Sequence, residues 1–124
     1  MQTSVAGKLS NVISLTSVSI LSVSDAVRKD DEKACLALIR RGIDLNQKYG
    51  TYLLSALLEA ASLNRVKIIS HLIKGGADLN LRDVDGRTPL MWASRSGHRE
   101  AVEILLRKGA SPLLKDDTGA TALA

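Results

Sequence analysis

The sequence predicts an all-α solenoid of stacked helix-turn-helix repeats with protruding, hairpin-like loops. The stretch from Asp83 to Lys115 forms one complete unit, and the residues after it restart the same pattern 33 positions later. Within the unit, Thr88-Pro89 is a typical helix start, and an apolar stripe of helical spacing ends just before Gly109. Such a unit can bury its apolar face only against its neighbours, so the repetition predicts a stack rather than one large globular core.

The segment 1–22 precedes the repeats and does not fit their pattern. Ser, Val, Ile and Leu dominate it, and Lys8 is its only charged residue. Polar residues interrupt its apolar runs and no basic cluster leads it, which disfavours a secretory signal and a membrane span. We expect an irregular N-terminal segment or cap, helical in part from about Val12, or a loosely ordered tail.

Two earlier units align with the Asp83 unit. A shift of 33 residues lays the stretch from Gly50 to Arg82 under it, and a further shift of 34 residues lays an N-terminal unit under that. The extra residue falls in the loop around Tyr49. The repeats are therefore expected to span 23–124, with units at about 23–49, 50–82 and 83–115 and a partial unit at 116–124.

Each second helix carries apolar residues at positions i, i+3 and i+4, which lie on one helical face. The three stripes are Cys35, Leu38 and Ile39; Ile69, Leu72 and Ile73; and Val102, Leu105 and Leu106. Gly42, Gly76 and Gly109 follow these stripes, and glycine most readily takes the left-handed conformation that ends a helix. The sequence therefore predicts three short second helices, each buried on one side.

The first helices are predicted from their start signals. The Thr88 hydroxyl can cap an exposed backbone amide, and Pro89 fits the first helical position. Ser55-Ala56 is a weaker version of this start, and Thr121-Ala122 keeps the cap without the proline. Between units, Asp85-Gly86 favours a tight reversal, so the connecting loop is expected to project as a hairpin-like finger.

The complete unit resembles the ankyrin repeat, whose pattern runs D-x-x-G-x-T-P-L-H-x-A, then G-H, an apolar helix and L-L-x-x-G-A. The matching residues are Gly86, Thr88, Pro89, Leu90, Ala93, Gly97, His98, Leu105, Leu106, Gly109 and Ala110. The resemblance implies an ankyrin-type solenoid and a non-enzymatic scaffold. It also implies that a protein partner, whose identity the sequence does not give, binds the concave face formed by the fingers and first helices.

The sequence departs from the family pattern at three places. Met91 replaces the histidine of T-P-L-H, which removes a hydrogen bond that would brace the helix cap. Leu53 stands where the next unit has Gly86, so we expect Gly50 to build the reversal of the earlier finger. Trp92 is large for a close stack, and we expect it to pack between units; the alternative is partial presentation on the concave face.

The resemblance assigns partner binding, by position, to the finger tips, the exposed side of the first helices and the flanking loops. These positions hold Tyr49, Thr51, Tyr52, Leu54, Ser62, Leu63, Arg82, Val84, Asp85, Arg87, Arg95, Ser96 and Lys115. Both tyrosines lie on or beside one finger, and an exposed tyrosine is a common interface anchor. The alternative is that the two rings merely pack the loop that carries the extra residue.

Two rival functions remain open at this point. Asn46 and Asn80 occupy the asparagine position of the family's G-A-D-x-N loop, and some ankyrin proteins are hydroxylated there, so the chain could be the substrate of an asparaginyl hydroxylase. Basic residues recur before each helix-ending glycine and would form a basic ridge that could bind nucleic acid weakly. They are Arg40, Arg41, Lys74, Arg107 and Lys108. We favour their ordinary role as charges that complement negative helix ends, so nucleic acid is an unlikely partner.

The sequence contains no convincing catalytic, metal or cofactor site. His71 and His98 occupy repeat positions and supply too few ligands for zinc, and we expect His98 to tie the turn between helices to the backbone. Asp30-Asp31-Glu32 is expected at a helix start, where carboxylates meet the positive end of the dipole. Cys35 is the only cysteine, which excludes an intramolecular disulfide and fits a cytoplasmic or nuclear location. We expect it to be buried.

The last complete unit is expected to have an uncovered outer face. The sequence stops within the partial unit, and Val102, Leu105 and Leu106 would partly line the face that a following unit normally shields. Self-association through this C-terminal face is therefore an expectation of the sequence.

Overall fold

The computed structural model describes residues 23–122, and every structural statement below concerns this range. The expected cap at 1–22 and the end of the partial unit at 123–124 lie outside it. A helical stretch at 23–28 is followed by α2 (Glu32–Arg40), α3 (Ala56–Ser62), α4 (Val66–Lys74), α5 (Pro89–Arg95) and α6 (Arg99–Arg107). These residues contain no strand, only an isolated bridge between Tyr49 and Leu54. The predicted all-α class is confirmed.

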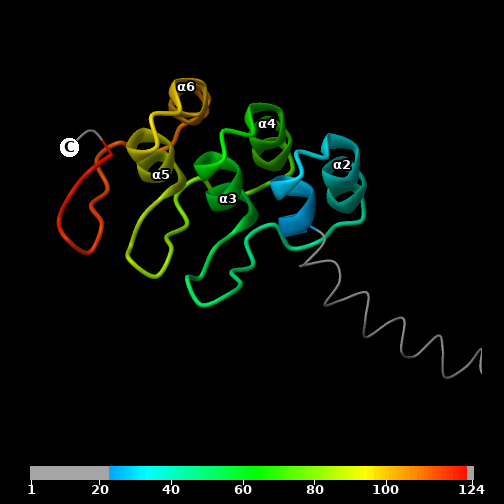
Figure 1. Ribbon diagram of the computed structural model, residues 1–124, viewed down its shortest axis with the longest axis horizontal. Coiled ribbons are helices and arrows are strands. Elements are labelled where there is room, and N and C mark those ends of the chain that lie inside the picture. Colours follow the sequence, from blue (N-terminus) through cyan, green and yellow to red (C-terminus); the bar gives the residue numbers. More distant parts are fainter. Residues whose placement is uncertain (1–22, 123–124) are drawn as a thin grey trace, which may run out of the picture.

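The helices form three successive pairs. Figure 1 shows the second helices α2, α4 and α6 in one row, and the stretch 23–28, α3 and α5 in a second row between it and the loops. Three loops project from the same side of the stack (Figure 1). The predicted solenoid of helix-turn-helix units with protruding fingers is therefore confirmed.

The predicted apolar stripes form much of the core. Cys35, Leu38, Ile69, Leu72 and Leu105 are buried, and Ile39 and Ile73 pack against them. Burial raises the pKa of the Cys35 thiol to about 11, so this cysteine is a neutral core residue as expected. Between the first helices the core is made of fully buried alanines, whose small side chains allow α3 and α5 to pack closely.

The predicted helix starts are present. The hydroxyls of Ser55 and Thr88 accept hydrogen bonds from the backbone amides of Leu58 and Met91, and Pro89 takes the first position of α5. The expected loss at Met91 is corrected, because the Thr88 amide donates to its sulfur at 3.5 Å. A thioether, a weak acceptor, therefore supplies the brace expected to be lost with the histidine.

The turns depend on residues with positive φ. Gly42, Gly76 and Gly109 take this conformation after the second helices, as predicted. Within the first two units, Asp30 and Asn64 adopt it at the turn between the paired helices, with φ of 56° and 58°. Asp and Asn tolerate this region better than most residues because their short polar side chains bond locally.

The prediction for the outer face of the third unit is partly wrong. Leu105 is fully buried, as is Ala101 one turn earlier on the same side of α6. This side belongs to the core, and α6 packs against α4. Leu106, in contrast, is 41% exposed. The outer face also has an open hollow lined by Ser94, Gly97, His98, Arg99, Val102 and Glu103.

Candidate protein-binding surface

The three fingers are closed at their bases by backbone hydrogen bonds. Tyr49 and Leu54 exchange two such bonds, at 2.8 and 2.9 Å, while the amides of Asp83 and Asp116 donate across the later bases, at 2.9 and 2.8 Å. Tyr49, Asp83 and Asp116 therefore occupy the same structural position, the first residue of a finger base. In the second and third fingers the aspartate Oδ1 also accepts two backbone amides of its own finger.

Neighbouring fingers are joined directly through their backbones. The amide of Val84 in the second finger donates to the carbonyl of Tyr52 in the first at 2.9 Å, and the amide of Asp117 in the third donates to the carbonyl of Asp85 at 3.0 Å. These bonds fix the three fingers relative to one another. The row of fingers is thus a preorganised surface rather than three independent loops.

The first finger reverses through two residues rather than one. Gly50 has a φ of 75°, as its expected role requires, but Leu53 also adopts the left-handed region, with a φ of 55°. Leu53 therefore takes on the conformation of Gly86, whose φ is 75°. A leucine with this backbone is strained, since its Cβ crowds the following carbonyl.

A buried carboxylate connects the first finger to two helices. Glu59 of α3 is buried, and it accepts hydrogen bonds from the Ser24 hydroxyl at 2.7 Å and from Arg28 Nε at 3.0 Å. It also accepts from the Tyr49 hydroxyl. Burial and this hydrogen bond raise the pKa of Tyr49. Sequence reasoning missed Glu59, although an acid within the apolar run ALLEAAS was a usable signal.

The second finger base carries an aromatic contact. The Trp92 indole nitrogen donates to Asp83 Oδ2 at 2.7 Å, and the Arg87 guanidinium lies 5.5 Å from the centre of the Trp92 ring. Trp92 is partly exposed and lies outside the buried core. The packing of Trp92 between units and its partial presentation on the concave face both stay predictions.

The third finger base binds a cation from the preceding helix. Arg95 of α5 donates to the buried Asp116 at 3.2 Å. The hydroxyl and amide of Thr118, the amide of Ala120 and the charge of Arg95 lower the pKa of the Asp116 carboxyl, and the Thr118 hydroxyl contributes most. This carboxylate therefore organises the finger while it orients Arg95.

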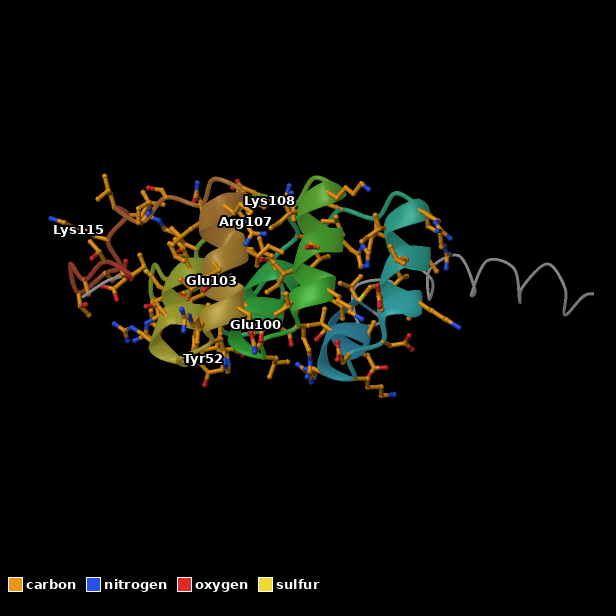
Figure 2. The ribbon with its side chains drawn as sticks, turned by 90° about the horizontal axis from the view of Figure 1, so that it is seen from above. Tyr52, Glu100, Glu103, Arg107, Lys108 and Lys115 are labelled. Atoms are coloured by element: carbon orange, nitrogen blue, oxygen red, sulfur yellow. The ribbon has the colours of Figure 1, made fainter. Side chains whose placement is uncertain are left out.

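The predicted partner-binding residues separate into distinct groups. Tyr49 and Leu54 are half-buried at a finger base, and Ser62 donates its hydroxyl to the Glu59 carbonyl at 2.8 Å. The exposed members are Thr51, Tyr52, Leu63, Arg82, Val84, Asp85, Arg95, Ser96 and Lys115, and Arg87 is half-buried. Figure 2 shows Tyr52 well apart from Lys115, which lies at the C-terminal end of the stack. The predicted set is therefore not one continuous patch.

Asn46 and Asn80 both connect successive units. The Asn46 side-chain oxygen accepts the Asp78 amide at 2.6 Å, and the Asn80 side-chain oxygen accepts the Ser111 amide at 3.2 Å. Each asparagine thus has a structural role in the folded stack. Their hydroxylation stays a prediction, and so does nucleic-acid binding by the basic ridge, whose five residues are all exposed.

The histidines have structural contacts. His98 Nε2 lies 2.9 Å from the Ser62 carbonyl, which confirms its expected tie to backbone. His71 Nε2 lies 2.6 Å from Glu32 Oε1, so α4 and α2 are joined on the outer row, and this hydrogen bond is the main cause of a lowered pKa at Glu32. Within residues 23–122, no group of three or more His, Cys, Asp or Glu residues could hold a metal ion.

The family model for ankyrin repeats, in three copies, matches residues 23–116. The chain belongs to the ankyrin repeat family. Among its relatives is an ankyrin repeat-containing protein of Treponema pallidum, which is 33% identical over 100 residues, a match that covers 81% of this chain and 34% of that protein. In this ankyrin chain, no helix of the described range is long and apolar enough to cross a membrane.

Other relatives of this ankyrin chain match only through a small part of their length. The ADP-ribosylation factor GTPase-activating protein AGD4 of Arabidopsis thaliana is 42% identical over 69 residues, which cover 56% of this chain and 9% of that protein. The human mitochondrial disaggregase is 43% identical over 63 residues, 51% of this chain and 9% of that protein. The chain thus spans about a third of the Treponema protein and less than a tenth of the other two.

Proposed function

We propose that this chain is a non-enzymatic interaction scaffold whose protein partner binds the face formed by the fingers and the exposed side of the first helices. Ankyrin repeats generally mediate protein–protein interaction, and the chain contains three matching copies. The proposal centres on the fingertip patch, which we define as Tyr52, Leu53 and Val84. Leu63, Ser96 and Arg95, near the ends of α3 and α5, extend the same binding face.

The exposure of the fingertip patch is the observation that carries the proposal. Tyr52, Leu53 and Val84 are 65%, 43% and 45% exposed. They are neighbours, because the Val84 amide donates to the Tyr52 carbonyl across the two fingers. Apolar side chains that remain exposed together are typical of protein interfaces, and tyrosine is enriched among the residues that dominate binding energy.

The rigidity of the patch supports the same conclusion. Bonds between neighbouring fingers fix the loops before any partner arrives, so less conformational entropy is lost on binding. Leu53 keeps an exposed apolar side chain at a position where its backbone is strained and glycine would relieve the strain. Strain of this kind gathers at binding sites, where the side chain itself is needed.

The test is affinity capture from a lysate of the source organism with the immobilised chain, followed by mass spectrometry and by titration of each purified candidate. The variant Tyr52→Ala with Val84→Ser should lose the specific proteins. The matched control is Leu106→Ser with Leu113→Ser, because these leucines are also exposed but lie on the third unit. The proposal is wrong if the fingertip variant retains all captured proteins, or if both variants lose the same ones.

A further inference from the structure

We propose that Lys48, Arg82 and Lys115 form a docking row for an extended acidic segment of a partner protein. We call these three residues the cation row. They are 34 and 33 residues apart, and each immediately precedes the first residue of a finger base. The row thus presents one positive charge per unit at the same structural position. This inference concerns a surface other than the fingertip patch and does not depend on it.

The charges of the cation row are available. All three residues are exposed, and none forms an ion pair with another residue of the described range 23–122. Arg28 and Arg95, in contrast, are already paired with Glu59 and Asp116. An acidic partner would therefore meet the cation row without first breaking a contact within the chain.

In each unit the cation of the row follows the cations of the basic ridge along the chain. Figure 2 shows Arg107 and Lys108 at one end of α6 and Glu100 toward its other end, with Lys115 beyond them at the C-terminal end of the stack. Lys48 and Arg82 hold the equivalent positions of the earlier units, so the same order of ridge and row cations recurs in each unit. The negative ends of the second helices explain the ridge. They do not explain the cation row, whose members lie in loops.

The spacing of the row suits an extended polypeptide. Packed helices lie about 8–10 Å apart, so equivalent residues of neighbouring units are separated by roughly that distance. A segment in the extended polyproline II conformation advances about 3.1 Å per residue with three residues per turn, so every third side chain would face the row. A segment with one acidic residue in three would therefore satisfy all three charges at once.

A continuous polyanion fits the cation row less well than a peptide does. Asp44 and Asp78 are exposed, and each lies along the chain between the ridge and row cations of its unit. A strand of phosphates would pass these carboxylates with a charge at every step, whereas a peptide can place uncharged residues opposite them. Aromatic stacking platforms beside the row are also lacking. Tyr49 donates to Glu59 of α3 and Trp92 donates to Asp83, while Tyr52 lies well apart from Lys115 in Figure 2.

The test uses fluorescence anisotropy at low ionic strength with two labelled peptides of the same composition. One carries glutamate at every third position, and the other carries its glutamates together. The row variant is Lys48→Gln with Arg82→Gln and Lys115→Gln. The control variant is Lys33→Gln with Lys67→Gln and Arg99→Gln, which removes the same charge from the starts of the second helices. All substituted residues are exposed, so both variants should keep the parent melting temperature.

We expect the parent to bind the spaced peptide more tightly than the clustered one. The row variant should weaken this binding about tenfold or more, and the control variant by less than about twofold. The affinity should fall as salt is added. The fingertip variant Tyr52→Ala with Val84→Ser should bind the spaced peptide as the parent does, so that failure of the proposed function and failure of this inference give different results.

Four outcomes would overturn the inference. The parent could fail to bind the spaced peptide at low salt, or the row and control variants could lose affinity equally. The clustered peptide could bind better than the spaced one. Finally, an oligothymidylate or vesicles containing phosphatidylserine could bind more tightly than the spaced peptide and depend on the row, which would assign the row to nucleic acid or to a membrane surface.

Discussion

Glu59 and Trp92 occupy equivalent positions of α3 and α5, and each forms a hydrogen bond with the base of its own finger. The donor lies on the finger in the first case and on the helix in the second. Glu59 accepts from the Tyr49 hydroxyl, whereas the Trp92 indole donates to Asp83. In one unit the acid lies on the helix and the aromatic ring on the finger; in the next the two are exchanged. The same joint between finger and first helix is thus made in two ways.

Replacement of Glu59 should destabilise the stack. Glu59→Ala leaves the buried hydroxyl of Ser24 and the hydroxyl of Tyr49 without their acceptor, and it removes the bond from Arg28. We expect a loss of about 1–3 kcal/mol in the free energy of unfolding, measured by urea denaturation. Glu103→Ala, which removes an exposed acid paired with Arg99, should change it by less than about 0.5 kcal/mol. Equal effects of the two changes would show that the Glu59 contacts contribute nothing specific.

The Tyr49 joint should make stability depend on pH in the alkaline range. Its pKa is raised in the folded chain, first by burial and then by Glu59, while an unfolded tyrosine ionises near pH 10. The folded state therefore holds the phenolic proton more tightly. The stabilisation that Tyr49 gives the folded state through its raised pKa is therefore complete below about pH 10 and is lost as the pH rises further. Unfolding measured from pH 8 upward should show a steeper loss for the parent than for Tyr49→Phe, and parallel curves would contradict the assignment.

Leu53 offers a stabilising substitution. Leu53→Gly removes the strain of a positive φ and gives up little burial, while glycine adds freedom to the unfolded chain. We expect a net gain of roughly 0.5–1 kcal/mol in the free energy of unfolding. Leu63→Gly is the matched control, because Leu63 is similarly exposed but has a φ of −104°. Leu63→Gly should lower the free energy of unfolding. If Leu53→Gly lowered it as well, the strain assigned to Leu53 would be absent.

The central stripe should be sensitive to truncation. Leu72 is fully buried in α4, which packs against α2 and α6, so Leu72→Ala should cost about 2–5 kcal/mol. Leu106→Ala, on the exposed side of α6, should cost much less. If thermal denaturation showed that the Leu72 variant melts within a degree or two of the parent, the assigned packing of the stack would be wrong.

The sequence predicted those features that depend on local chemistry repeated at a fixed period. Thr88-Pro89 and the helix-ending glycines specify where helices begin and end, and the i, i+3, i+4 stripes specify their buried sides. It did not predict the partners of Glu59 and Trp92, because these depend on how a finger folds back onto a helix. The sequence also placed Leu105 on the uncovered outer face, although this residue is buried, for a related reason. A stripe reveals that a face is apolar but does not reveal which neighbour covers each residue.

The contact between the second and third fingers can be tested with two glycines of equal backbone strain. Gly50 and Gly86 both have a φ of 75°, so alanine at either position should incur a similar penalty of about 1–2 kcal/mol. At Gly50 the new methyl would meet nothing within 4 Å, whereas at Gly86 it would lie 2.5 Å from the Asp117 side chain and 3.1 Å from its amide nitrogen.

The Asp117 amide donates to the Asp85 carbonyl, so Gly86→Ala should also weaken this hydrogen bond between the fingers. We expect Gly86→Ala to cost about 0.5–1.5 kcal/mol more than Gly50→Ala and to speed amide exchange at Asp117. Equal destabilisation by both variants, with unchanged exchange at Asp117, would show that the fingers are not held together at this point.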